Sequence, residues 1–253
     1  MPDVVRDRFL ELAGGKRARL VVIPTASSWA ELPGVPRSYD YWKAQNVASV
    51  VVMHTRKRQQ ADDPAFVKPL QEATGVWLGG GDQSKLVAVY HGTAVEKELQ
   101  KLLARGGVIG GTSAGASAMS AVMIEGGNPT AVVGTGLGLL PGVVIDQHFL
   151  NRNRLDRLLG VLARHPSYLG VGIDEQTAVI VKGHTLTVEG NATVRVCFAA
   201  WGRLPPSVQV LKSGGKVDLL DLFQNVTARL SPPPGKDATA GGPAPAAPDK
   251  GGR

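Results

Sequence analysis

The sequence contains a single cysteine, Cys197, among 253 residues, so no disulfide can form within the chain. Nothing in it therefore requires an oxidising compartment. Aromatic residues make up only 5%, which argues against the stacked rings that bind single-stranded nucleic acid. Long apolar runs are also missing. The run at residues 47–53, for example, is much shorter than the roughly 20 residues that a helix needs to cross a bilayer. We expect neither nucleic acid nor a membrane as a partner.

The first twenty residues carry eight charged side chains and no uninterrupted apolar stretch. This argues against a secretory signal peptide, and we expect a cytoplasmic protein. The formal net charge is +7, but the chain has no Lys/Arg run that resembles a binding arm. We therefore interpret the excess positive charge as a solvated basic surface. His54, His91, His165 and His184 show no metal-ligand spacing, and we expect no metal and no cofactor.

Short apolar runs alternate with amphipathic segments over the first 176 residues, which predicts strands alternating with helices. Runs that are apolar on both faces suit a covered parallel sheet, so we predict an α/β fold with a doubly wound, mostly parallel sheet. The expected strands are residues 20–23, 49–53, 76–78, 107–110, 143–146 and 169–174. The expected helices are residues 4–12, 39–46, one or two within 84–104, 116–123, and 151–164.

The pattern changes after Gln176. Three short β-type runs, at residues 178–181, 185–189 and 194–199, predict a C-terminal antiparallel meander. From Ser231 onward the chain is rich in proline and glycine and has no large apolar residue. We therefore expect one domain over residues 1–230 and a disordered tail over residues 231–253.

Ser113 is a candidate nucleophile, because residues 110–115 read Gly-Gly-Thr-Ser-Ala-Gly. This fits the Gly-x-Ser-x-Gly elbow, in which small neighbours relieve the crowding of a sharp strand-to-helix turn. Backbone N–H groups at the start of the following helix can stabilise an oxyanion. A glycine-rich turn before a helix can also cradle a phosphate, but no lysine follows here as a P-loop requires.

A serine hydroxyl needs a base to become a nucleophile. His148 closes the apolar run at residues 143–145, and Glu175 follows the run at residues 169–174. Catalytic groups gather at the carboxyl ends of strands in open α/β sheets, so His148 can be the base and Glu175 the acid that orients it. The alternative is an ordinary strand-end histidine and a solvated loop carboxylate.

Four segments together resemble the cyanophycinase family, serine peptidases of family S51 whose flavodoxin-like fold is that of class I glutamine amidotransferases. The segments are residues 78–83 (LGGGDQ), the turn at Ser113, residues 146–149 (DQHF) with the arginines that follow, and residues 172–178 (GIDEQTA). They keep the order and approximate spacing of the family. The resemblance covers about residues 19–222.

The resemblance implies a role for each matched residue. Ser113 would be the nucleophile, His148 the base and Glu175 the acid of a triad. The backbone of Gly80, Gly81 and Ala114 would form the oxyanion hole. The side chains expected in the substrate pocket are Gln83, Asp146, Gln147, Arg152, Arg154 and Arg157. On an ideal helix Arg152 points away from the other two arginines, so a common pocket requires an irregular start near Asn151.

The resemblance also implies a substrate. The family cuts cyanophycin, a polyaspartate with arginine on each side-chain carboxylate, to β-aspartyl-arginine dipeptides. Guanidinium groups bind carboxylates bidentately, so several arginines suit an aspartyl unit. A homodimer is a further expectation from the family. An Asp-specific dipeptidase of the same family and a non-catalytic binding module with this fold remain as alternatives.

The sequence departs from the family pattern at its start. The family usually opens with a strand and a glycine-rich turn before the helix expected at residues 4–12. This sequence begins with Met1 inside that region. We therefore expect either that a strand beside the Ser113 turn is absent or that the start is assigned too late.

Overall fold

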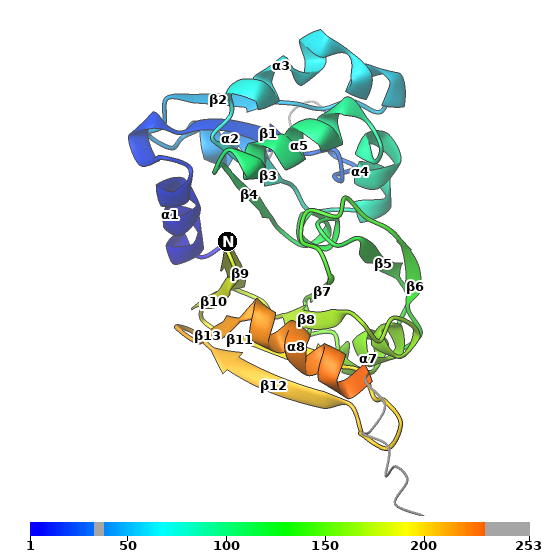
Figure 1. Cartoon of the computed structure of the whole chain (residues 1–253). Coiled ribbons are helices and arrows are strands. Elements are labelled where there is room, and N and C mark those ends of the chain that lie inside the picture. Colours follow the sequence, from blue (N-terminus) through cyan, green and yellow to red (C-terminus); the bar gives the residue numbers. More distant parts are fainter. Residues whose placement is uncertain (33–37, 231–253) are drawn as a thin grey trace, which may run out of the picture.

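The computed structural model describes residues 1–32 and 38–230 (Figure 1), so the predicted disordered tail lies outside the described residues. Its first half is built on a parallel sheet with the strand order β2-β1-β3-β4. These strands confirm the first four predicted from the sequence. They are β1 (Arg19–Ile23), β2 (Ser49–Val52), β3 (Gly75–Leu78) and β4 (Val108–Gly111).

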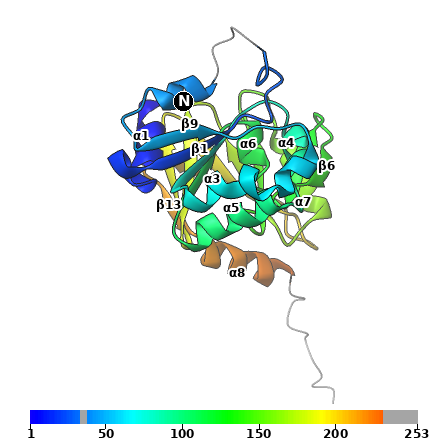
Figure 2. The same ribbon diagram turned by 90° about the horizontal axis from the view of Figure 1, so that it is seen from above.

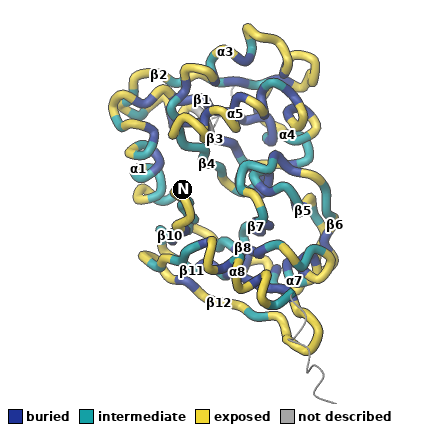
Figure 3. The backbone as a smooth tube through the Cα atoms, viewed as in Figure 1, coloured by how far each residue is buried: buried dark blue, intermediate teal, exposed yellow. Residues whose placement is uncertain are grey.

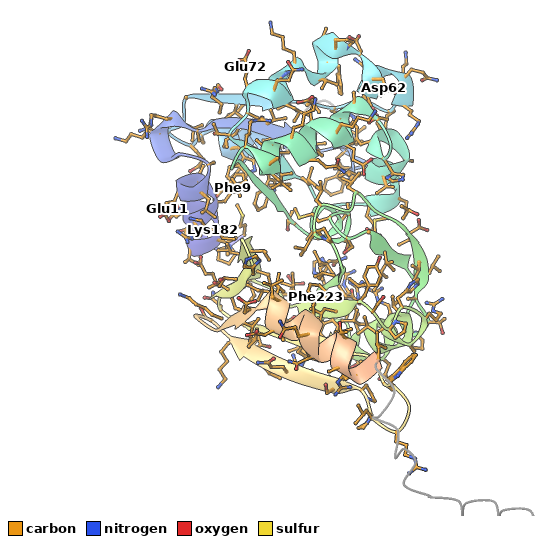
Figure 4. All side chains as sticks on the ribbon, in the orientation of Figure 1. Phe9, Glu11, Asp62, Glu72, Lys182 and Phe223 are labelled. Atoms are coloured by element: carbon orange, nitrogen blue, oxygen red, sulfur yellow. The ribbon has the colours of Figure 1, made fainter. Side chains whose placement is uncertain are left out.

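Helices cover both faces of this parallel sheet, as the doubly apolar strands predict. Val21 and Ile23 of β1 join the core on one face, whereas Leu20 and Val22 pack on the other with an aromatic cluster that includes Phe9. Figure 4 shows Phe9 pointing inward from its helix and Glu11 pointing away. One face carries α3 (Pro64–Glu72), α4 (Gln83–Tyr90) and α5 (Ala94–Ala104), and the other carries α1 (Asp3–Leu12) and α2 (Ser38–Lys43) (Figure 2).

The second half is a mixed sheet with the order β12-β11-β8-β7, in which only the β7–β8 pair is parallel. One helix packs on each face, and the outer strand β12 is largely exposed (Figure 3). The strands are β7 (Val143–Gln147), β8 (Leu169–Ile173), β11 (Thr193–Phe198) and β12 (Ser207–Lys212), and the helices are α7 (Leu155–Arg164) and α8 (Leu219–Leu230).

The expected meander is split between two sheets. Strand β10 pairs with β9 on one side and with β13 on the other, whereas β11 joins the mixed sheet because its side chains are buried on both faces. A hairpin of β5 and β6 connects the two halves of the chain. The remaining elements are β5 (Val122–Gly126), β6 (Val132–Thr135), β9 (Thr177–Lys182), β10 (Thr185–Gly190), β13 (Lys216–Asp218), α6 (Ala114–Ser117), and the 3-10 turns η1 (Gly15–Arg17) and η2 (Arg58–Asp62).

The prediction of a helix over residues 116–123 is wrong. Helix α6 ends after four residues, and the chain continues as β5. Ser120 explains part of the difference, because its Oγ accepts a hydrogen bond from Ile145 N at 2.9 Å and ties the turn to β7. The helix predicted over residues 151–164 begins at Leu155, after a turn, which is the irregular start that the arginine spacing required.

A cavity of about 720 Å³ lies between the two halves. Strand β4 pairs with β3, and β7 pairs with β8, but no pairing joins β4 to β7 within the described ranges. Ile109 of β4 lines the cavity together with Ile145 of β7 and Ile173 of β8. The absence of a strand beside the Ser113 turn stays a prediction. No helix in the described part of the chain is long and apolar enough to span a bilayer.

Candidate active site

Ser113 lies at the sharp turn between β4 and α6, with a backbone φ of 51°. Such a positive φ is strained for a residue with a side chain and recurs at active sites. The flanking glycines make the turn possible. A Cβ on Gly111 would lie 2.6 Å from Gly115 C, and one on Gly115 would lie 2.2 Å from Leu78 O. The predicted elbow is therefore present in the structure.

Three side chains from the ends of three strands form a continuous hydrogen-bonded series. Ser113 Oγ, after β4, lies 2.9 Å from His148 Nε2, after β7. His148 Nδ1 contacts Glu175 Oε1, after β8. With the carboxylate on Nδ1–H, the Nε2 lone pair faces the serine hydroxyl, which is the tautomer that a general base needs.

Glu175 is held ionised by its surroundings. The hydrogen bond with His148 lowers the pKa of this carboxyl below its usual value, with smaller contributions from Asn151 and Arg152. Asn151 Nδ2 lies 3.4 Å from Glu175 Oε1, and Asp174 Oδ1 accepts from Glu175 N at 3.0 Å. We did not predict Asn151 or Asp174 as site residues, although both stand next to predicted ones in the sequence.

The candidate oxyanion hole combines two segments. Gly80 lies beside the serine, because a Cβ built on it would be 3.4 Å from Ser113 Cβ. Within the described residues, no hydrogen bond is found for the backbone N–H of Gly80 or of Ala114. Both are thus available to an oxyanion. The backbone N–H of Gly81, the third predicted oxyanion-hole residue, is likewise without a hydrogen bond within the described residues, and the position needs a glycine because a Cβ there would lie 2.3 Å from Ala26 O.

Two of the predicted substrate arginines are engaged in a buried cluster. Arg157 donates from Nε to Asp146 Oδ2 at 2.9 Å and from Nη2 to Oδ1. Arg154 Nη1 donates to the backbone oxygen of Gln147, and lies 3.4 Å from Asp146 Oδ1. Asp146 is fully buried, and this burial raises its pKa while both arginines act in the opposite direction. The cluster joins the end of β7 to the start of α7.

The other predicted pocket residues differ in their environment. Gln83 is buried, and its Nε2 donates to Ile124 O at 2.8 Å and to Glu125 O at 2.7 Å. Gln147 lines the same cavity as Ser113 and His148. Arg152 is exposed in the turn after β7, and no side-chain partner is found for it in the part of the chain that the structure describes. Of the three predicted arginines, Arg152 is therefore the one whose guanidinium has no hydrogen bond within the described residues.

No group of three or more His, Cys, Asp or Glu side chains is placed to hold a metal ion within residues 1–32 and 38–230. Cys197 is buried away from the elbow, and burial raises the pKa of its thiol to about 12. A thiol with so high a pKa is almost entirely protonated at neutral pH and is a poor nucleophile. The nucleophile of this site is therefore expected to be an oxygen.

Comparison with known proteins places this geometry in a family. The sequence pattern of Peptidase family S51 matches residues 3–189. The chain belongs to peptidase family S51. It is 36% identical over 201 residues to the cyanophycinase of Geminocystis herdmanii, which covers 76% of this chain and 74% of that protein. It is 38% identical over 198 residues to the cyanophycinase of a Nostoc species, which covers 74% of this chain and 66% of that protein.

Solved structures support the S51 fold. A crystal structure of a peptidase from an acI-B1 Actinobacterium matches with a TM-score of 0.65 and 22% identity, over 85% of this chain and 90% of that one. A putative peptidase E from Listeria monocytogenes matches with a TM-score of 0.50 and 18% identity, over 73% of this chain and 92% of that one. These structures show a shared mixed α/β fold, whereas the family match and the cyanophycinase relatives show that the chain is a serine-type peptidase of family S51.

Proposed function

We propose that this S51 peptidase hydrolyses cyanophycin or related β-aspartyl peptides to dipeptides such as β-Asp-Arg, through an acyl-enzyme on Ser113. The observation that carries the proposal is the hydrogen-bonded series Ser113–His148–Glu175, which brings together residues that follow three different strands. The cyanophycinases that the chain resembles supply the substrate class.

The first half-reaction forms the acyl-enzyme. Ser113 Oγ attacks the scissile carbonyl carbon, while His148 Nε2 takes the hydroxyl proton. Glu175 stabilises the resulting imidazolium through Nδ1–H. The tetrahedral intermediate then collapses, the C–N bond breaks, and the leaving amine receives the proton from Nε2. Water repeats the sequence on the ester, and its hydrolysis restores the Ser113 hydroxyl.

The negative charge on the carbonyl oxygen needs donors that are already in place. The N–H groups of Gly80, Gly81 and Ala114 have no partner in the part of the chain that the structure describes, lie near Ser113 and are suited to this role. Gly81 contributes by its conformation, with a φ of 136° that lets the loop approach Ala26 closely. A preorganised loop costs no rearrangement at the moment of reaction.

Substrate recognition is assigned to the polar side chains around the turn after β7. Arg152 is exposed and suited to pair with an aspartyl carboxylate. Gln147 adds an amide group on the cavity wall. Arg154 and Arg157 neutralise Asp146, and Arg154 Nε is buried without a hydrogen-bond partner within the described residues. Gln83, at the start of α4 and hydrogen-bonded to the backbone of β5, is assigned to the substrate site as well.

The deciding experiment is incubation of the purified protein with cyanophycin, followed by mass analysis of the products. We expect release of β-aspartyl-arginine by the wild type and none by Ser113→Ala. Ser213→Ala, at an exposed turn after β12, is the matched control and should retain full activity. Full activity in Ser113→Ala would remove this serine from the mechanism.

The same preparation distinguishes the two alternatives. Hydrolysis of α-aspartyl dipeptides but not of β-aspartyl peptides would assign the chain to the Asp-specific dipeptidases. A folded protein that neither cleaves these peptides nor reacts with a fluorophosphonate at Ser113 would be a binding module. Labelling of Ser113 by the fluorophosphonate supports an activated serine independently of the substrate.

A further inference from the structure

A buried hydrogen-bond network lies at the carboxyl ends of β1 and β2, outside the proposed catalytic series. Its centre is Thr25, which is completely buried. Thr25 Oγ1 lies 2.9 Å from His54 Nδ1 and 2.8 Å from the hydroxyl of Tyr90, also completely buried. His54 Nε2 lies 3.2 Å from Glu31 Oε1. The network joins the loop after β1 to the segment after β2 and to α4.

The loop after β1, residues 24–30, is held by further contacts on the same side. Arg56 donates from Nη1 to Thr25 O and from Nη2 to Ser27 O at 2.6 Å. Lys85 Nζ donates to Ser28 Oγ at 2.7 Å. Backbone and side-chain groups of this loop are therefore held by two elements, the segment after β2 and helix α4.

On its other side, this loop supports the glycine loop after β3. Asp82 N donates to Ala26 O at 2.9 Å, and Gly79 N donates to Ile23 O at 2.9 Å. Gly81 lies so close to Ala26 that a Cβ would be only 2.3 Å from its carbonyl oxygen. Between these contacts lies Gly80, whose backbone is next to Ser113. A shift of Ala26 would consequently move Gly80.

A neutral His54 satisfies the hydrogen-bond pattern. With the proton on Nε2, His54 donates to Glu31 and accepts at Nδ1 from the Thr25 hydroxyl, which accepts in turn from Tyr90. A second proton on Nδ1 would leave the hydroxyl hydrogen of Thr25 or Tyr90 without an acceptor among these groups. Burial lowers the pKa of His54 and raises that of Tyr90 to about 12, so both are neutral near pH 7.

We propose that Thr25, His54 and Tyr90 are positioning residues, which hold residues 24–30 against Gly81 and thereby fix the oxyanion donor of Gly80 beside Ser113. The inference rests on the proposed function for its catalytic consequence. The contact between the two loops stands on the structure alone. The charged groups that face His54 are Glu31, which attracts its protonated form, and Arg56, which repels it.

The test uses Thr25→Val, which keeps the shape of the side chain and removes the hydroxyl. Two quantities are measured, the rate constant for fluorophosphonate labelling of Ser113 and the hydrogen exchange of the Asp82 amide. We expect labelling to slow about tenfold, which is less than the ~10²–10³ lost on removing an oxyanion donor. We expect the Asp82 amide to exchange about tenfold faster. KM for a peptide substrate should stay within roughly a factor of two of the wild-type value, because the Gly80 N–H donor acts in the transition state.

Thr25→Ser is the matched control, since it retains the hydroxyl and should restore both quantities. Tyr90→Phe is the second variant, and it should slow labelling in the same direction. Wild-type exchange at Asp82 in Thr25→Val would overturn the proposal. So would faster exchange at Asp82 with an unchanged labelling rate, or faster exchange that is equally large in α7. Failure of the wild type to be labelled would instead overturn the proposed function, and the exchange data alone would then decide whether the loop is held.

Discussion

Ser113 Oγ and His148 Nε2 lie 2.9 Å apart, although 35 positions separate the two residues in the chain. Each residue has a positive φ, 51° for Ser113 and 52° for His148. Both backbone turns are unfavourable for residues with side chains, and both point the side chain out of a strand end. The shared strain indicates that the fold stabilises this pair against its local conformational preference.

Glu175 is expected to be needed for catalysis because its carboxylate keeps the proton of His148 on Nδ1. In Glu175→Gln, an amide replaces the carboxylate and can donate to Nδ1, which stabilises the wrong imidazole tautomer. We expect kcat to fall by about 10²–10⁴, with KM and the thermal unfolding temperature unchanged. Glu72→Gln, on the exposed surface of α3 (Figure 4), is the control. An active Glu175→Gln enzyme would exclude this carboxylate from the mechanism.

The sequence predicted strands β1 to β4 and β7 to β11, and the three catalytic candidates, because their signals are local, whereas β5, β6, β12 and β13 were not predicted. Apolar runs mark β1 and β8, and Ser113, His148 and Glu175 stand at or near strand ends. The partners of the arginines could not be read in this way. Asp146 and Arg157 are eleven positions apart and meet only because the chain turns before α7. Likewise, residues 116–123 have an apolar pattern that suits a helix or a strand, and the bond from Ile145 to Ser120 favours the strand.

The arginines are expected to separate into two classes by their effect on stability. Arg157→Leu leaves Asp146 buried without its bidentate partner, and we expect the free energy of unfolding to fall by about 3–5 kcal/mol. Arg152→Ala removes an exposed side chain, so the free energy should change by less than about 0.5 kcal/mol. Urea unfolding measures both.

Arg152 is expected to affect substrate binding even though its removal leaves stability almost unchanged. If Arg152 pairs with a substrate carboxylate, its removal should raise KM about tenfold or more, which is the size expected for a lost charge-assisted hydrogen bond. Arg203→Ala, on an exposed loop, controls for the loss of one positive charge. A wild-type KM in Arg152→Ala would remove this arginine from the substrate site.

His54 should make stability depend on pH. Burial lowers its pKa in the folded protein, so below about pH 6.5 the unfolded chain binds more protons than the folded one. The free energy of unfolding should therefore decrease as the pH falls through this range and be fully retained above it. Thermal unfolding between pH 7.5 and 5.0 should show a steeper loss in the wild type than in His54→Asn. His184→Asn, in an exposed hairpin turn, should follow the wild type, and parallel curves for the wild type and His54→Asn would contradict the prediction.

Two glycines in helices should respond oppositely to the same substitution. Gly115 in α6 packs on the carbonyl of Leu78, and a Cβ there would lie 2.2 Å from the oxygen, so Gly115→Ala must displace the backbone next to Ser113. We expect a loss of about 1–3 kcal/mol or more in the free energy of unfolding, together with slower labelling of Ser113. At Gly160 in α7 the same position is open, because no described atom outside its own stretch of helix lies within 4 Å. Gly160→Ala should therefore stabilise the protein by about 0.5–1 kcal/mol through its higher helix propensity, with labelling unchanged. Equal effects of the two substitutions would mean that the elbow tolerates a side chain at Gly115, in contradiction to the close backbone approach.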